Sequence, residues 1–228
     1  MARERMGNVY DAAKQLSEGK LVVIYDGDER EGEADLVVGA RFARPETVET
    51  MRKDGGGLLC VAIGSGDAEK LGLPFFTDLL ESSGSRLAAM ACAKTAYGDT
   101  PAFSLMVNHR NVYTGITDND RSLTITKIDD IVRSAATASG TTMAEEFRKQ
   151  FYSPGHVFLL IGRGLENRRG HTELSLWLGE KAGLGAMVLC EMLGSGKALS
   201  KEKAKAYAKR KGLVFVEGKE IRAEAERL

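Results

Sequence analysis

Residues 26 to 35 concentrate side chains that could bind a metal ion or move protons. The segment reads DGDEREGEAD, with six carboxylates against the single base Arg30, so its local charge is −5. The chain has 32 acidic residues among 228, a composition that would place about one or two in ten residues. A solvent-exposed acidic turn is the ordinary interpretation of such a run. This run joins two apolar segments, which favours a site for a divalent cation or a carboxylate tuned for proton transfer.

Spacing within this segment also predicts which carboxylates act together. Side chains alternate along an extended chain, so Glu31, Glu33 and Asp35 would point to one side. Carboxylates held that close raise one another's pKa unless a cation neutralises them. Either outcome, a bound metal or a proton-transfer group, would serve catalysis.

A second group of polar residues occupies 162 to 173, which read GRGLENRRGHTE. An apolar strand leads into a glycine-rich loop and then into a helix that begins near Thr172. Backbone N–H groups, the helix dipole and arginine side chains converge at such a corner, which suits a phosphate group. No G-K-[ST] follows, so this is not a P-loop. His171 could bind a metal or exchange protons there, although a capping or packing role is equally open.

Single residues elsewhere carry weaker signals. Glu191 ends an apolar strand at a place where sheets present catalytic groups. Cys60 and Cys190 lie in apolar strands, where a small buried side chain is the usual role. His156 precedes a strand and is most simply structural, and Asp120 could be an N-cap.

Length and composition restrict the class of protein. The 228 residues, 43% of them hydrophobic, fit one domain spanning 1–228. Equal numbers of acidic and basic residues give no net charge, which argues against a nonspecific nucleic-acid binder. The charged segment 1–7 lacks the apolar centre of a secretory signal, and no apolar run is long enough for a membrane span. Three separated cysteines argue against a disulfide framework. We therefore expect a cytoplasmic protein with reduced thiols that binds neither membrane nor nucleic acid.

The elements that position these residues follow from apolar periodicity and from Gly and Pro punctuation. We expect helices at residues 8–18, 45–54, 120–136, 141–151, 171–181 and 201–211. We expect strands at residues 21–25, 34–40, 58–63, 102–108, 157–161 and 186–190. This alternation predicts an α/β domain of the α+β type, a single mixed sheet flanked by helices.

Taken in order, these motifs resemble 3,4-dihydroxy-2-butanone 4-phosphate synthase, a lyase family of riboflavin biosynthesis. The segments that carry the resemblance are DEREGEAD at 28–35, GLLC at 57–60, TGITDNDR at 114–121, PGHVF at 154–158, Arg168 with GHTE at 170–173, and VLCE at 188–191. The family commonly has Asn and Gly where this chain has Gly32 and Ala34. The resemblance does not extend to the alanine-rich segment 84–101.

The resemblance implies conversion of D-ribulose 5-phosphate to formate and L-3,4-dihydroxy-2-butanone 4-phosphate with Mg²⁺ or Mn²⁺, two ions per site. By motif position, Glu31 and His171 would hold the metal. The positions implied to bind substrate are Arg30, Glu31, Asp35, Thr117, Arg168, Arg169, Gly170, His171 and Thr172. The positions implied to move protons or orient reacting groups are Asp26, Glu33, Cys60, His156 and Glu191. The family is a homodimer with sites near the subunit interface, so a second copy of the chain is the expected partner.

Two alternatives remain open from the sequence. The same residues could serve another metal-dependent sugar-phosphate isomerase or lyase. A module that binds phospho-ligands or nucleic acid through the basic residues 197–210 is a second class, but it would leave the acidic segment unexplained.

Overall fold

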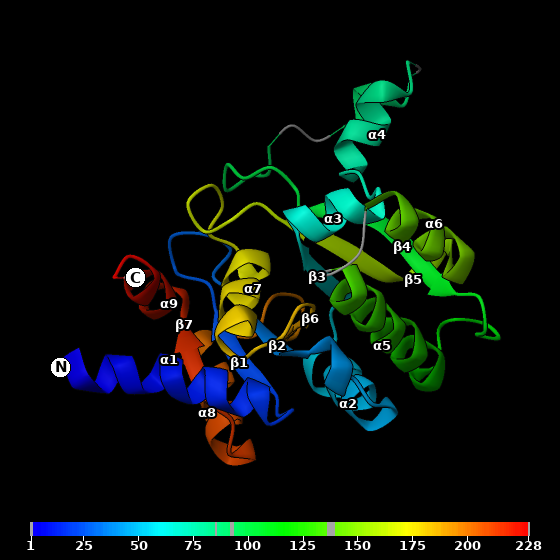
Figure 1. The fold of residues 1–228 in the computed structure, drawn as a ribbon. Helices are drawn as coiled ribbons and strands as arrows, with labels where there is room; N and C mark the ends of the chain where they lie inside the picture. The colour runs from blue at the N-terminus through cyan, green and yellow to red at the C-terminus, as the bar shows by residue number, and fades with distance from the viewer. Residues whose placement is uncertain (1, 85, 92–93, 136–139, 228) are drawn as a thin grey trace.

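The chain folds around one mixed β-sheet with helices on both faces (Figure 1). The computed structural model describes residues 2–84, 86–91, 94–135 and 140–227. The strand order is β4-β5-β3-β6-β2-β1-β7, with β1–β7 and β3–β5 parallel and the other pairs antiparallel. The strands are β1 (Val22–Tyr25), β2 (Ala34–Gly39), β3 (Cys60–Gly64), β4 (Phe103–His109), β5 (Phe151–Gly162), β6 (Met187–Glu191) and β7 (Phe215–Glu217). The predicted fold class is confirmed.

Helices and short helical turns connect these strands. The α-helices are α1 (Ala2–Ser17), α2 (Pro45–Thr50), α3 (Ser65–Leu71), α4 (Phe76–Ser82), α5 (Asp118–Ala135), α6 (Gly140–Gln150), α7 (His171–Lys181), α8 (Lys201–Lys211) and α9 (Gly218–Ala225). The short turns are the 3₁₀ segments η1 (Ala40–Phe42) and η3 (Ala88–Met90) and the π-helical turn η2 (Met51–Gly55). Among the described residues, no helix is both long enough and apolar enough to cross a membrane.

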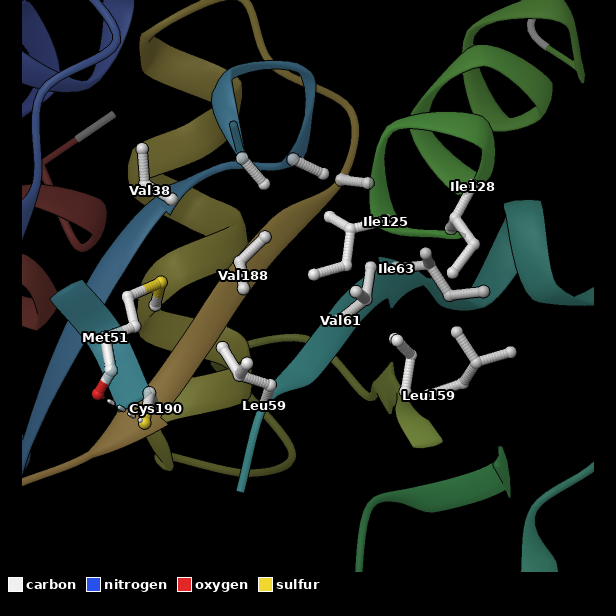
Figure 2. Close-up of a cluster of buried hydrophobic side chains, with 14 of the residues drawn as sticks. Val38, Met51, Leu59, Val61, Ile63, Ile125, Ile128, Leu159, Val188 and Cys190 are labelled. Atoms are coloured by element: carbon white, nitrogen blue, oxygen red, sulfur yellow. Dashed lines mark hydrogen bonds between the residues drawn. The ribbon is translucent and has the colours of Figure 1, made fainter. Parts of the chain in front are cut away.

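Alternating strand side chains divide the core into two layers. On one face, Val38, Val61 and Val188 belong to the same apolar cluster as Met51 of η2 and Ile125 and Ile128 of α5 (Figure 2). On the other face, Val37, Cys60 and Leu189 meet the apolar sides of α1, α7 and α9. The central strands are therefore apolar at consecutive positions, which is the continuous pattern seen in the sequence.

The same alternation gathers polar side chains on the α7 face of the sheet. In the β2–β6 register Asp35 lies opposite Glu191, and in the β3–β6 register Cys60 lies opposite Leu189. Asp26 directly follows β1 with the same parity as the buried Ile24. Four adjacent strands thus aim their polar residues at the start of α7, which lies across them (Figure 1).

Several expected elements differ from those observed. The helix expected at 45–54 is α-helical only to Thr50 and closes with the π-helical turn η2. The strand expected to start at residue 157 begins at Phe151 as β5, so His156 lies within a strand. Asp120 is inside α5, where its carboxylate accepts the N–H groups of Thr114 and Gly115 and closes the preceding turn. The short elements α3, α4, α9 and β7 were not expected.

Candidate active site

A cavity of about 390 Å³ opens between the sheet and the N-terminus of α7. Most of the polar residues singled out in the sequence lie on its wall, and Tyr97 and Phe103 close its outer side. The lining residues are Glu31, Glu33, Asp35, Cys60, Thr95, Tyr97, Pro101, Ala102, Phe103, Leu160, Arg168, His171, Thr172, Leu189 and Glu191. Glu31, Glu33 and Asp35 line the same cavity as predicted, but not through strand alternation, because the chain turns at Gly32 and is extended only from Ala34.

Asp26 organises the acidic loop. Its buried carboxylate accepts hydrogen bonds from the N–H groups of Gly27 at 2.8 Å, Glu31 at 3.1 Å and Glu33 at 3.0 Å, and from Arg30 Nη1 at 3.0 Å. These bonds wrap the loop around one side chain, which leaves Asp26 a positioning role.

Gly32 lets the same loop turn. Its φ is +67°, a left-handed conformation that glycine adopts freely and asparagine tolerates better than most residues. The family's asparagine at this position is therefore compatible with the same turn.

His171 stands at the first turn of α7 and faces the carboxylates. Its Nδ1 lies 3.4 Å from Glu31 Oε2, and its Nε2 lies 3.7 Å from Asp35 Oδ1. Burial alone would lower the imidazole pKa, but the charges of Asp35 and Glu31 outweigh it and raise the pKa to about 9. Burial likewise opposes ionisation of Glu31, yet its hydrogen bond with His171 holds the carboxyl pKa at about 2. Glu31 and His171 therefore form a charged pair in the metal-free protein.

Asp35 and Glu191 form an acidic pair, in addition to the charged pair of Glu31 and His171. Burial raises the pKa of Asp35 to about 7 against the opposing effect of His171, and Glu191 adds repulsion. Glu191 Oε2 accepts the Leu58 N–H at 2.7 Å, which fixes its carboxylate over the neighbouring Gly57. Burial and the charge of Glu31 raise the pKa of Glu33 as well.

The site's donor set fits a divalent cation. Asp26, Glu31 and His171 each offer a ligand atom, and these atoms lie within 4.8 Å of one another. Asp35 Oδ1 is buried without a hydrogen-bond partner, as expected of a carboxylate oxygen that faces a cation. Carboxylate oxygens with one imidazole nitrogen suit Mg²⁺ or Mn²⁺. Because three of the acceptor positions on Asp26 are taken by backbone N–H groups, Glu31 and His171 are the freer ligands.

Cys60 and Thr172 complete the floor of the cavity. Burial in the sheet raises the pKa of the Cys60 thiol well above its usual value, so the group is a neutral thiol. Thr172 is buried in the first turn of α7, where its backbone N–H has no earlier helical partner.

Two buried arginines converge beside that helix end. Arg168 Nη1 lies 2.7 Å from Glu173 Oε2, and a Cβ on Gly170 would lie 2.7 Å from Arg30 Nη2 and still closer to Arg168. Glycine at position 170 thus lets both guanidinium groups approach the backbone. Two guanidinium groups at a helix N-terminus form an anion site.

Several residues of this site, among them Tyr97 and Asp99, lie in the segment 84–101 that the resemblance did not cover. The Tyr97 ring stacks over the Arg30 guanidinium at 4.7 Å, and its hydroxyl hydrogen-bonds Glu31. Asp99 Oδ2 lies 2.8 Å from Arg30 Nε. The sequence carried no signal for either residue, because an isolated tyrosine and aspartate in a polar turn stand out neither by charge density nor by spacing.

Three of the residues implied by the resemblance lie away from this cavity. His156 and Thr117 are both exposed. Asn108 Oδ1 accepts the His156 N–H at 2.8 Å, whereas Thr117 lines a separate hollow with Pro45 and Asn119. Arg169 is exposed on a separate cavity of about 730 Å³ beside Glu173. One chain therefore assembles the carboxylates, His171 and two arginines, but not His156, Thr117 or Arg169.

Comparisons with known proteins agree with this fold. The family model for 3,4-dihydroxy-2-butanone 4-phosphate synthase matches residues 10–224. A protein of that name from Methanosarcina mazei is 46% identical over 94% of this chain and 89% of its own length, and one from Methanothermobacter thermautotrophicus is 41% identical over 93% of each. Among solved structures, a crystal structure of 3,4-dihydroxy-2-butanone 4-phosphate synthase in complex with two magnesium ions superposes with a TM-score of 0.75 at 25% identity, covering 96% of both chains.

Proposed function

The chain belongs to the 3,4-dihydroxy-2-butanone 4-phosphate synthase family, and we propose that the cavity beneath α7 is its active site. The protein is a lyase that converts D-ribulose 5-phosphate to formate and L-3,4-dihydroxy-2-butanone 4-phosphate, a step of riboflavin biosynthesis. The observation that carries the site assignment is the position of His171, 3.4 Å from Glu31 and 3.7 Å from Asp35, next to Gly170, where the Arg30 and Arg168 guanidinium groups meet. That arrangement places a cation site next to an anion site, as a metal-dependent reaction of a sugar phosphate requires.

The reaction uses a divalent metal, and we propose Glu31 and His171 as its protein ligands, with two Mg²⁺ or Mn²⁺ ions at each site. A relative with two magnesium ions and the acidic donor set here both support this assignment. When bound, such ions polarise carbonyl and hydroxyl oxygens of a substrate and stabilise negative charge that develops on them. Few protein ligands suffice because Mg²⁺ keeps several waters and takes other ligands from substrate.

The arginines and the start of α7 are suited to hold the substrate phosphate. Arg168, the backbone of Gly170 and the Thr172 hydroxyl surround one end of the cavity. Asp35 lines the cavity beside His171, and Arg30 meets Arg168 at Gly170, so we place the sugar hydroxyls between the Asp35 and Arg30 side chains. Ionic hydrogen bonds at a helix N-terminus would fix the phosphate, and thereby the register of the five-carbon chain.

Proton transfer falls to the remaining side chains. The reaction releases one carbon as formate, so protons must leave and return to carbon and oxygen at several steps. Glu33, in the loop before β2, and Glu191, at the end of β6, both line the cavity, and the Leu58 N–H orients Glu191. The Cys60 thiol is a neutral donor on the cavity floor, and Asp26 acts on this machinery by holding the loop that carries Glu31 and Glu33.

We assign His156 and Thr117 to the site of a second subunit in a homodimer. Both are exposed, and both stand near the β4–β5 edge beside exposed Tyr113, Ile116 and Tyr152. Phe103, at the other end of β4, is also exposed and lines the cavity. A second copy seated there would cover these aromatic side chains and bring its His156 toward the cavity.

Two broader expectations accompany this assignment. The family match over residues 10–224 supports treating 1–228 as a single catalytic domain. Small-molecule biosynthesis of this kind supports a cytoplasmic location, which fractionation of the source cells would test.

Arg169 faces the neighbouring cavity, so we assign it no direct contact with the substrate phosphate.

The test is formate release from ribulose 5-phosphate with Mg²⁺, with and without chelator. Glu31→Gln and His171→Ala should each abolish formate release, and Glu29→Gln is the matched control because Glu29 lies exposed in the same loop and pairs with Arg222. Near-normal turnover in Glu31→Gln or His171→Ala would contradict the metal assignment. Conversion of ribulose 5-phosphate to an isomer without formate would instead identify a sugar-phosphate isomerase.

A further inference from the structure

A carboxylate of the chain itself lies in the proposed phosphate site. Asp99 Oδ2 is 2.8 Å from both Nε and Nη2 of Arg30 and 3.7 Å from Arg168 Nε. Both guanidinium groups are nine-tenths buried and meet beside Gly170 at the start of α7. Asp99 therefore occupies the point where two cations and a helix N-terminus converge.

The two arginines are incompletely satisfied by this contact. Arg30 Nη2 and Arg168 Nε are buried and make no hydrogen bond of acceptable geometry, although both face Asp99. Their other groups are engaged, since Arg30 also pairs with Asp26 and Glu31, and Arg168 with Glu173. One carboxylate oxygen shared between two guanidinium groups leaves donors unused, whereas a phosphate group presents three oxygens.

A short turn delivers Asp99 to this position. The Asp99 carbonyl accepts the Thr95 N–H at 2.8 Å and the Thr95 hydroxyl at 3.1 Å, and Gly98 N–H binds the Thr95 carbonyl at 2.9 Å. The Asp99 side chain retains about a quarter of its exposure, so a rotamer change would carry it to solvent. The turn can stay closed while the carboxylate leaves, because its bonds involve only the Asp99 backbone.

We propose that Asp99 is an internal counter-ion that fills the phosphate site of the free enzyme and is displaced when a phosphorylated ligand binds. This inference rests on the proposed function, because it takes the arginine pair as the phosphate site. Buried guanidinium N–H groups that lack an acceptor are costly, and Asp99 offsets part of that cost for Arg30 Nη2 and Arg168 Nε in the free enzyme. The exchange weakens the net affinity for phosphate, since each binding event must first break the Asp99 contacts, and it favours release of a phosphorylated product.

The experiment compares inorganic phosphate binding to metal-free protein by isothermal titration calorimetry in EDTA. Asp99→Asn removes the competing charge and keeps the shape, so phosphate affinity should rise roughly tenfold, as for the loss of a close charge competitor. Asp99→Ala should raise phosphate affinity as well. It controls for hydrogen bonds that the asparagine amide could still make. Asp78→Asn makes the same charge change on the exposed side of α4 and should leave phosphate affinity unchanged. KM for ribulose 5-phosphate should fall in parallel with the phosphate dissociation constant.

The double variant Arg168→Ala/Glu173→Gln separates this inference from the site assignment. It removes the arginine together with the buried charge that would be orphaned, while an amide oxygen can still accept the Arg163 N–H. If the double variant binds phosphate as the unchanged enzyme does, the phosphate site is wrong and this inference falls with it. If it loses phosphate binding while the Asp99 variants bind equally or more weakly than the unchanged enzyme, the site stands and Asp99 is not its counter-ion.

Discussion

Asp35 on β2 and Glu191 on β6 lie directly opposite each other across an antiparallel strand pair, on the face covered by α7. Neither carboxylate has a basic side chain opposite it in that register, and Asp35 Oδ1 makes no hydrogen bond. Like charges at directly opposed positions destabilise a sheet. A cation in the cavity would offset that repulsion. The stability of the protein is therefore expected to depend on bound metal.

The first prediction concerns this acidic pair. Asp35→Asn should raise the melting temperature of the metal-free protein at pH 8.5, above the Asp35 pKa of about 7. The substitution removes a charge whose burial, together with repulsion by Glu191, outweighs its attraction to His171. The gain should be about 1–2 kcal/mol, and the further rise on adding Mg²⁺ should shrink. Thermal melts in EDTA and in Mg²⁺ measure both effects. Asp28→Asn, in the exposed part of the loop, is the control. An unchanged Mg²⁺-dependent rise in Asp35→Asn would show that Asp35 does not face the cation.

A second prediction uses the close approach of Gly57 to Glu191. A Cβ at position 57 would meet the Glu191 carboxylate and lie 2.7 Å from the Glu191 Cβ, so Gly57→Ala must push that side chain away. We expect kcat to fall about tenfold to a hundredfold, as for a reacting group displaced by an ångström. Gly66→Ala adds the same methyl group where no atom lies within 4 Å, and should keep full activity in the formate assay. Normal kcat in Gly57→Ala would argue against any precise placement of Glu191.

The dimer assignment predicts complementation between inactive variants. If one site needs His171 from one subunit and His156 from the other, His156→Ala and His171→Ala are each inactive alone. Randomly mixed subunits form half heterodimers, each with one intact site, so co-expression should restore about a quarter of the activity. Separately purified variants mixed without subunit exchange serve as the control. Absence of recovery in a verified heterodimer would place His156 outside the shared site.

A fourth prediction concerns acid stability away from the site. Burial opposes ionisation of Glu217, but hydrogen bonds from Lys219, Lys201 and Lys205 outweigh it and hold the carboxyl pKa at about 2. A pKa lowered on folding contributes stability above the unfolded value of about 4.5, and that stability is lost as pH falls toward 2. Glu217→Gln should therefore lose less stability between pH 5 and pH 2.5, by about 1 kcal/mol after allowance for solvent screening. Urea unfolding across that range measures the difference, with Glu202→Gln on α8 as the control; parallel curves for Glu217→Gln and the unchanged protein would contradict it.

The sequence predicted the central elements because their residues are buried in a simple pattern. Strands such as β2 and β6 are apolar at consecutive positions, since both faces of the sheet are covered. The three-residue strand β7 escaped prediction because it depends on parallel pairing with β1, about 190 residues away in sequence. Strand order escaped for the same reason, since pairing partners are chosen by tertiary contacts that local periodicity does not encode.

The sequence likewise predicted only part of the candidate site. The acidic loop and the arginine–histidine corner were detectable because charge and glycine are concentrated there. Tyr97 and Asp99 were not, because their contacts with Arg30 are made across almost 70 residues of chain. The sequence also could not show that His156 and His171 lie apart in one chain. The order of motifs along the chain carries no information about how residues of one or two subunits come together.

The alternation of side chains along the sheet has a consequence for how this enzyme can fail. Asp35 and Glu191 reach the cavity only because β2 and β6 are paired in one particular register. A slip of one residue would turn Leu36 toward the cavity and Asp35 into the apolar layer that packs on α5. Chains with the wrong β2–β6 register would thus be both unstable and inactive. Measured turnover therefore reports only the chains whose strands are correctly aligned.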